Sequence, residues 1–264
     1  MADKVVLLPG WGLGPAALEP LQHALQGALP SLRVSIEPLP LVASVEQALD
    51  ALEASLPTGA WLLGWSLGGM LAVALAARRG ADCPGVITLA SNACFVAQAG
   101  WPTAMGRATF DGFSALCATD RAATLKRFSL LCAQGSYEAP YVASEAIDPV
   151  AANPGCDQAQ HRRAAARALA KQLLPVSDEY ADPASLALLG ALDNRAALTE
   201  LSVPQLHLFA QGDALVPEQA ALALEHAVPQ ARVRRLAGSH ALPIEAPTQV
   251  AAQVAAFIEE GNHA

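Results

Sequence analysis

The pentapeptide Gly64-Trp65-Ser66-Leu67-Gly68 has the spacing of a serine nucleophile on a sharp turn. In such a G-x-S-x-G sequence a strained turn between a strand and a helix exposes the hydroxyl group. Glycine is needed on both sides because a Cβ atom there would collide with neighbouring backbone. The run 61–63 predicts a strand before the turn, and an alanine-rich helix is predicted from the turn to about Arg79. This context favours a catalytic Ser66 over a chance occurrence of the pattern.

A serine hydroxyl is a weak nucleophile unless a base takes its proton and an acid orients that base. With this pentapeptide the partners are expected in the order serine, acid, histidine, each just after a late strand. Asp213 follows the apolar run 206–210, and His240 follows the run 231–236, so both fit. Asp182 and Asp193 are rival acids, but neither follows a predicted strand. Structural or solvated roles are expected for the other histidines, which are His23, His161, His207, His226 and His263.

Hydrolysis of an ester also requires N–H donors aimed at the oxyanion of the tetrahedral intermediate. The residue after the nucleophile, Leu67, is expected to supply one backbone N–H. The second is expected from Trp11, in the loop after the first predicted strand, where Gly10 and Gly12 allow close approach of the backbone. The alternative for Trp11 is an indole packed on an ordinary turn.

One dense basic stretch, residues 160–171, interrupts a chain with formal net charge −8. Arg163, Arg167 and Lys171 recur every four residues, so a helix would place them on one face. Lys126 and Arg127 lie in the same part of the chain. The stripe is either a solvated helix face or a docking surface for an acidic partner or a phosphate, and the sequence leaves both open.

Apolar runs alternate with helical patterns along both ends of the chain. Strands are expected at 4–8, 33–36, 60–64, 86–90, 206–210 and 231–236, and helices at 15–28, 44–56, 66–79 and 247–260. Such alternation predicts an α/β fold with a mostly parallel sheet covered by helices on both faces. Residues 100–200 break the alternation, since they are helical in composition and punctuated by proline. We predict one domain, 1–264, with its core in about 1–98 and 200–264 and a helical lid in about 99–199.

The composition excludes several classes of protein. The 264 residues are 53% hydrophobic, 15% charged and 5% aromatic, which is ample for a large core and far from a disordered chain. The acidic balance and scarce aromatics argue against nucleic acid as a partner. No apolar run reaches the roughly 18 residues of a membrane span, so no membrane association is expected. Five scattered cysteines without metal spacing indicate reduced thiols and a cytoplasmic protein. We expect a monomer that needs no metal or organic cofactor.

Several stretches together resemble the pimeloyl-[acyl-carrier protein] methyl ester esterases of biotin synthesis. They are Trp11-Gly12, Gly64-Trp65-Ser66-Leu67-Gly68-Gly69, Ala90-Ser91-Asn92-Ala93-Cys94-Phe95, Trp101-Pro102, Arg127-Phe128, Gly212-Asp213-Ala214-Leu215-Val216-Pro217 and Gly238-Ser239-His240-Ala241. The resemblance spans nearly the whole chain. The motifs around the serine, acid and histidine are shared with all α/β-hydrolases, whereas Gly-Trp-Ser-Leu-Gly-Gly and Ala-Ser-x-x-Cys-Phe are more specific.

The resemblance implies an α/β-hydrolase fold with a helical lid, and an enzyme that frees the carboxylate of a pimeloyl chain attached to acyl carrier protein. It also implies that Arg127, Arg163 and Arg167 meet the acidic carrier and its phosphopantetheine, and that Phe128 lines the acyl channel. The chain departs from that family in two ways. The leading hairpin of the sheet is expected to be missing, and residues 133–160 hold extra sequence within the lid.

Two other functions remain open at this point. On the same scaffold, the chain could be a broad short-chain carboxylesterase or a C–C bond hydrolase. From a different class, it could be a non-catalytic binding module that retains the fold. The complete set of serine, acid, histidine and oxyanion loops favours an enzyme, specifically a serine esterase.

Overall fold

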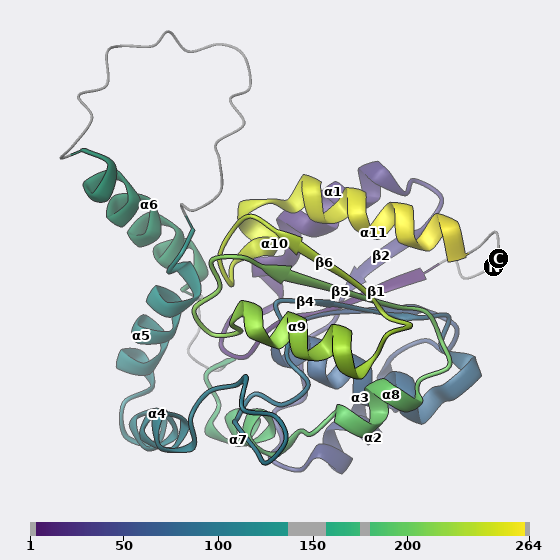
Figure 1. The fold of residues 1–264 in the computed structure, drawn as a ribbon, viewed down its shortest axis with the longest axis horizontal. Coiled ribbons are helices and arrows are strands. Elements are labelled where there is room, and N and C mark those ends of the chain that lie inside the picture. The colour runs from purple at the N-terminus through teal and green to yellow at the C-terminus, as the bar shows by residue number, and fades with distance from the viewer. Residues whose placement is uncertain (1–3, 137–156, 175–179, 262–264) are drawn as a thin grey trace, which may run out of the picture.

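A single parallel sheet organises the molecule. The computed structural model describes residues 4–136, 157–174 and 180–261, with side chains described from residue 163 onward in the helix that begins at 157 (Figure 1). Six strands follow the spatial order β2-β1-β3-β4-β5-β6, and every neighbouring pair is parallel. They are β1 (Lys4–Leu8), β2 (Arg33–Ile36), β3 (Trp61–Trp65), β4 (Val86–Leu89), β5 (Gln205–Ala210) and β6 (Arg232–Leu236). The predicted fold class is confirmed.

Helices cover both faces of this sheet. Figure 1 shows α1 (Glu19–Ala28) and α11 (Pro247–Gly261) together on one side. On the other side lie α2 (Val45–Ser55), α3 (Leu67–Arg79), α8 (Arg195–Glu200) and α9 (Glu218–Ala227). β1, β3, β4 and β5 are buried almost throughout, which explains why their sequences are continuously apolar rather than alternating. The helix expected from residue 15 begins instead as a 3-10 turn, Pro15–Leu18, and becomes α1 at Glu19.

The chain between β4 and β5 forms a helical insertion. It contains α4 (Arg107–Thr119), α5 (Arg121–Ala133), α6 (Asp157–Leu173) and α7 (Pro183–Ala191), and none of its described residues joins the sheet. α5 packs against both α4 and α6, and α4 packs against α7. Much of the extra sequence at 133–160 lies outside the described residues. Within the described ranges, no helix is both long enough and apolar enough to cross a membrane.

Candidate active site

Ser66 lies on the turn between β3 and α3. Its φ is 55° and its ψ is −118°, a conformation that strains any residue with a side chain. The two glycines of the pentapeptide are required by backbone contacts. A Cβ atom on Gly64 would overlap the Gly68 carbonyl, and one on Gly68 would overlap the carbonyl of Leu8 in β1. The local sequence therefore folds as predicted, with the serine at the carboxyl end of β3.

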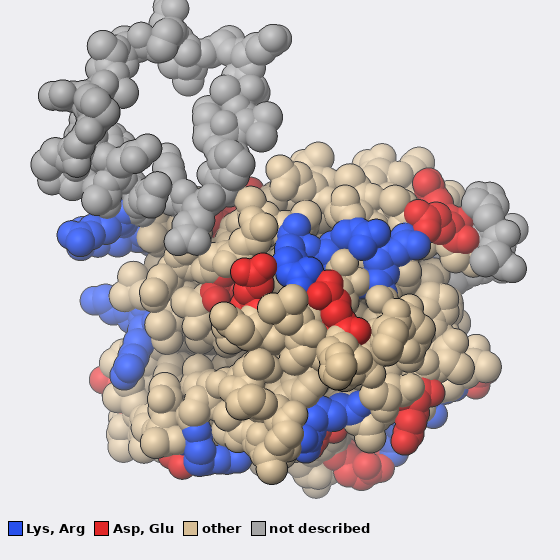
Figure 2. All heavy atoms as spheres, in the orientation of Figure 1, with Lys and Arg blue, Asp and Glu red and all other residues tan. Residues whose placement is uncertain are grey.

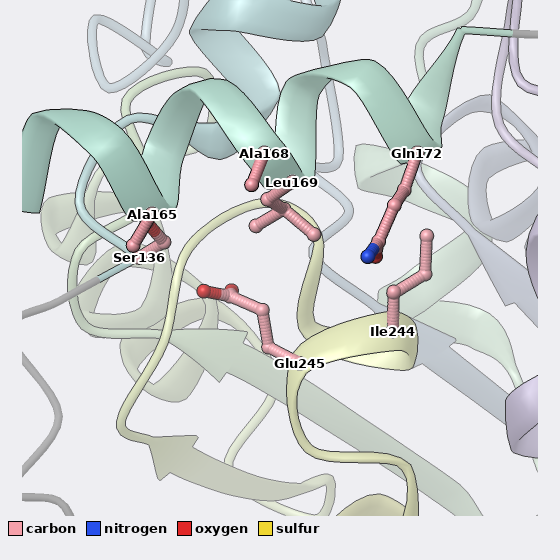
Figure 3. Close-up of a pocket in the computed structure, with 7 residues that line it drawn as sticks. All are labelled: Ser136, Ala165, Ala168, Leu169, Gln172, Ile244 and Glu245. Atoms are coloured by element: carbon pink, nitrogen blue, oxygen red, sulfur yellow. The ribbon is translucent and has the colours of Figure 1, made fainter.

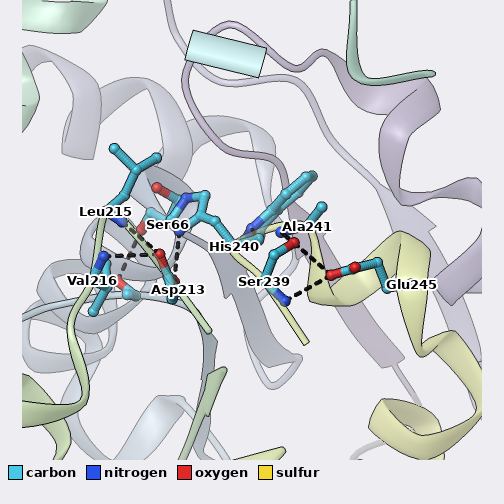
Figure 4. A network of polar contacts seen from close by, with 10 residues as sticks. Ser66, Asp213, Leu215, Val216, Ser239, His240, Ala241 and Glu245 are labelled. Atoms are coloured by element: carbon cyan, nitrogen blue, oxygen red, sulfur yellow. Dashed lines mark hydrogen bonds and ion pairs between the residues drawn. The ribbon is translucent and has the colours of Figure 1, made fainter. Parts of the chain in front are cut away.

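Asp213 follows β5 and presents a fixed carboxylate. Its Oδ1 atom accepts hydrogen bonds from the N–H groups of Leu215 (2.8 Å) and Val216 (2.9 Å). Its Oδ2 atom lies 2.8 Å from Nδ1 of His240, and both side chains are fully buried (Figure 4). Because the backbone bonds hold one oxygen, the other is kept pointing at the imidazole.

His240 follows β6 and is held by two contacts. An ionised carboxylate only accepts hydrogen bonds, so Nδ1 of His240 carries the proton that Asp213 binds, and Nε2 of the neutral ring is an acceptor. Nε2 is buried and makes no hydrogen bond to any described residue. The indole Nε1 of Trp65, the residue before Ser66, donates to the His240 carbonyl at 2.8 Å. This bond ties the serine turn to the histidine loop.

The rival acids have structural partners. Asp193 forms an ion pair with Arg195 (2.7 Å) and accepts a hydrogen bond from the Cys94 thiol (3.2 Å). The Arg195 guanidinium is the main reason that the pKa of Asp193 falls to about 2. Asp182 caps α7, where its Oδ2 atom accepts from the N–H of Ser185 at 3.1 Å. Neither is hydrogen-bonded or ion-paired to His240, whose carboxylate partner is Asp213.

The other histidines whose side chains the structure describes have partners away from His240 or are exposed. His207 lies in β5 with Nδ1 2.8 Å from Thr88 Oγ1, and burial lowers its pKa to about 4. His23 and His226 are exposed on α1 and α9. The side chains of His161 and His263 lie outside the described residues. The structural or solvated roles expected of His161 and His263 therefore stay predictions.

The loop of residues 9–14 lies directly against the serine turn. A Cβ atom on Gly10 would stand 3.3 Å from Cβ of Ser66. Within the described ranges, no hydrogen bond uses the backbone N–H of Trp11 or of Leu67. The Trp11 indole is packed as well, since its Nε1 atom donates to the Asp182 carbonyl (3.1 Å). The two alternatives for Trp11 are therefore compatible, because the ring is packed while the backbone N–H is unused.

Aromatic rings of the insertion cover this loop. Phe128 in α5 and Phe113 in α4 contact the Trp11 indole edge-on, with ring centroids 5.2 Å and 5.5 Å away. Phe128 is buried, and its ring covers part of the Trp11 indole. A cavity of about 10 Å³ lies beside the same loop, between it and Leu39, Leu41 and Tyr180.

A larger cavity of about 380 Å³ separates α6 from α10 (Leu242–Glu245). Figure 3 shows the Glu245 carboxylate directed into it from α10, opposite the α6 side chains. Its lining comprises Ser136, Ala165, Ala168, Leu169, Gln172, Ile244 and Glu245. Burial raises the pKa of Glu245. Sequence reasoning overlooked this residue, although an acidic side chain five positions after His240 was the available signal.

The basic residues of the insertion form an exposed edge. Arg127 on α5 and Arg163, Arg167 and Lys171 on α6 are all exposed, as the four-residue spacing predicts. α5 and α6 pack against each other, and Figure 2 shows Lys and Arg side chains along the edge they form. No ion pair involves these four side chains among the residues that the structure describes. In the same ranges, no group of three or more His, Cys, Asp or Glu side chains is arranged to hold a metal.

Comparison with known proteins identifies the fold family first. Residues 37–247 match the family model for the alpha/beta hydrolase fold. An esterase from Exiguobacterium antarcticum superposes with a TM-score of 0.72 at 16% identity, covering 97% of this chain and 92% of that one. The enol-lactonase from Burkholderia xenovorans LB400 gives a TM-score of 0.71 at 18% identity, with 98% and 92% coverage.

Relatives with higher sequence identity identify the family within this fold. The pimeloyl-[acyl-carrier protein] methyl ester esterase of Aromatoleum aromaticum is 35% identical, with 88% of each chain covered. The protein of the same name from Aeromonas hydrophila is 33% identical, covering 93% of this chain and 91% of that one. The biotin biosynthesis bifunctional protein BioHC of Cellvibrio japonicus is 37% identical over 97% of this chain, which spans only 47% of that longer protein. This chain therefore belongs to the α/β-hydrolase fold family and, within it, to the family of pimeloyl-[acyl-carrier protein] methyl ester esterases.

Proposed function

We propose that this protein is a serine carboxylesterase that hydrolyses the methyl ester of a pimeloyl chain carried on acyl carrier protein, and so frees the pimeloyl carboxylate for biotin synthesis. The observation that carries the proposal is the buried Asp213–His240 pair, tied through Trp65 to the strained Ser66 turn. Family membership supports the substrate, because the relatives of similar length carry the name of that reaction.

Ser66 Oγ attacks the ester carbonyl while Nε2 of His240 takes its proton. Asp213 holds Nδ1–H, which keeps Nε2 as the accepting nitrogen and stabilises the imidazolium that forms. The tetrahedral intermediate collapses, the bond to the methoxy oxygen breaks, and His240 gives its proton to that oxygen, so that methanol leaves and the acyl-enzyme remains. Water, activated by the same histidine, cleaves the acyl-enzyme and releases the pimeloyl carboxylate with Ser66 restored.

The unused N–H groups of Trp11 and Leu67 bind the oxyanion of each tetrahedral intermediate. Leu67 begins α3, so the positive end of the helix dipole adds to the stabilisation of that charge. Phe128, which packs on Trp11, borders the path of the acyl chain. No resident metal or organic cofactor takes part in these steps.

The carrier protein docks on the basic edge. Arg127, Arg163 and Arg167 are exposed arginines without described acidic partners, so their charge is available to an acidic carrier and its phosphate. Residues 99–199 act as the lid over a core formed by 1–98 and 200–264, within one domain. The enzyme works as a monomer in the cytoplasm, where its free thiols Cys83, Cys94, Cys117 and Cys132 stay reduced.

The test compares kcat/KM for the pimeloyl methyl ester on acyl carrier protein with kcat/KM for the free ester, using Ser66→Ala as the blank. A strong preference for the carrier-bound ester is expected, and Arg163→Gln with Arg167→Gln should remove it. Arg234→Gln, an exposed arginine on β6, is the matched control and should retain the preference.

Other outcomes would redirect the proposal. Equal rates on both substrates would indicate a broad short-chain carboxylesterase. The exposed basic residues of α5 and α6 would then be a solvated helix face and not a docking surface. Activity on a C–C bond but not on esters would indicate a C–C bond hydrolase. Failure of a fluorophosphonate probe to label Ser66, while a control hydrolase reacts, would indicate a non-catalytic binding module.

A further inference from the structure

Glu245 is bonded to the loop that carries His240. Its Oε2 atom accepts two hydrogen bonds from Ser239, one from the backbone N–H at 2.8 Å and one from the hydroxyl at 2.5 Å. The Ser239 hydroxyl in turn accepts from the N–H of Ala241 at 3.2 Å. One carboxylate oxygen thus fixes the residues on both sides of the histidine (Figure 4).

These bonds complement the one made by Trp65. The indole of Trp65 holds the His240 carbonyl, whereas Glu245 binds the N–H of Ser239 directly and, through the Ser239 hydroxyl, holds the N–H of Ala241. Ser239 and His240 are both fully buried, and removal of the carboxylate would leave the Ser239 N–H and hydroxyl without their acceptor. An imidazole that must meet Asp213 on one side and Ser66 on the other depends on such a fixed backbone.

The placement of Glu245 is not explained by the stability of α10 alone. α10 is a single turn of four residues, so its dipole gives the Glu245 carboxylate little support, and burial of this carboxylate raises its pKa. The second oxygen of Glu245, Oε1, makes no hydrogen bond to the described residues. The described hydrogen bonds of the Glu245 side chain are therefore all made to Ser239, in the loop that carries His240.

We propose that Glu245 is a positioning residue for catalysis, which acts through Ser239 and Ala241 to hold the His240 imidazole between Asp213 and Ser66. The inference rests on the proposed role of His240 as the base, but not on the identity of the ester. A displacement of reacting groups by about 1 Å lowers rates by roughly 10²-fold, so the loss of this support should reduce kcat far more than it changes KM.

The test uses Glu245→Ala, Glu245→Gln and Ser239→Ala, with Glu259→Gln as the matched control because Glu259 is exposed on α11. Hydrolysis of a short p-nitrophenyl ester gives kcat and KM without the carrier protein. Proton NMR of the same samples follows the far-downfield resonance of the Nδ1–H that Asp213 binds. Circular dichroism verifies that each variant is folded.

Glu245→Ala should lower kcat by about 10²-fold, leave KM nearly unchanged and shift or broaden the downfield resonance. Glu245→Gln keeps an acceptor oxygen and should restore part of kcat, Ser239→Ala should show a smaller loss, and the control should match the parent. In a His240→Ala background, adding Glu245→Ala should cause no further loss, since Glu245 acts only through the histidine.

A folded Glu245→Ala or Ser239→Ala variant with the parent's resonance and kcat would overturn the proposal. So would an equal loss of rate in the presence and absence of His240. If the parent itself neither hydrolyses esters nor reacts with a fluorophosphonate, the proposed function fails, while the NMR comparison still decides whether Glu245 orients the imidazole.

Discussion

The indole nitrogen of Trp65 and the carbonyl oxygen of His240 are joined by a hydrogen bond of 2.8 Å across 175 positions of sequence. Trp65 immediately precedes Ser66, and its ring also lies 6.2 Å from the imidazole, centroid to centroid. The bond links the end of β3 to the loop after β6, two segments that are not adjacent in the sheet. The tryptophan of the pentapeptide is therefore part of what places the histidine relative to the serine.

Trp65→Phe should lower kcat about tenfold or more, because it removes the donor to the His240 carbonyl and frees the histidine loop to move. The expected loss of one buried hydrogen bond is about 1–3 kcal/mol of unfolding free energy. Steady-state kinetics on a short ester and thermal melting measure the two effects.

Trp61→Phe is the control for that substitution. Trp61 is also buried in β3, but its indole nitrogen has no hydrogen-bond partner in the described part of the chain. This variant should keep the parent's kcat even if packing against Phe257 is altered. Equal kcat losses in both variants would show that the hydrogen bond to His240 is unimportant.

Asp213→Asn should leave the fold intact and lower kcat by about 10⁴-fold. The amide oxygen can still accept from Leu215 and Val216, which leaves the NH₂ group facing Nδ1 of His240. That donor stabilises the imidazole tautomer with its proton on Nε2, which cannot accept the Ser66 proton. Asp193→Asn changes a rival acid and should keep kcat within about tenfold of the parent, even if it weakens the contact with Arg195. Steady-state kinetics and melting curves of both variants distinguish the two carboxylates.

The six strands and the placement of Ser66, Asp213 and His240 after strand ends could be predicted because they depend on local patterns. Buried parallel strands have continuous apolar sequences, and a catalytic acid and base follow late strands. The position of Glu245 beside Ser239 could not be predicted in the same way. It depends on how the short helix α10 folds back onto Ser239, and four-residue helices carry little periodic signal.

The hydrogen-bond partners of Asp182 and Asp193 also could not be predicted from the sequence. Asp193 meets Cys94 across 99 positions, and that contact exists only because the insertion returns to the edge of the core. The indole of Trp11 likewise finds a carbonyl at Asp182, 171 residues away. Contacts of this kind are set by tertiary packing, so neither propensity nor spacing reveals them.

Gly135→Ala should disturb the active site from within the insertion. Gly135 follows α5 with φ of 86°, and a Cβ atom there would overlap the carbonyl of Gly212, the residue before Asp213. The strained backbone alone should lower the unfolding free energy by roughly 1–3 kcal/mol, and relief of the overlap requires the insertion or the acid loop to move. We expect a lower melting temperature together with a lower kcat.

Gly112→Ala provides the opposite case. Gly112 lies within α4, and nothing stands within 4 Å of the Cβ atom that alanine would add. Alanine should raise the unfolding free energy by about 0.5–1 kcal/mol because it favours the helix, and kcat should stay unchanged. A Gly135→Ala variant as stable and active as the parent would mean that the close approach of Gly135 to Gly212 does not constrain the loop that carries Asp213.

His207 should make the stability of the fold depend on pH below neutrality. Burial lowers the pKa of His207 from 6.5 to about 4, so between these values the unfolded chain binds a proton that the folded chain does not. The free energy of unfolding therefore rises with pH across this window. The contribution of His207, roughly 3 kcal/mol in total, is lost as pH falls from 6.5 toward 4. His207→Asn, whose amide can still reach Thr88, should lower stability at pH 7 but flatten this slope.

Carboxylates also titrate in this range, so the informative quantity is the difference between the parent and each variant in urea unfolding at closely spaced pH values. His226→Asn removes an exposed histidine from α9 and is the matched control for the loss of one imidazole elsewhere in the chain. A His207→Asn variant with the parent's full slope would show that His207 accepts its proton equally well in the folded and unfolded chain. That result would be incompatible with the buried, neutral imidazole between β4 and β5.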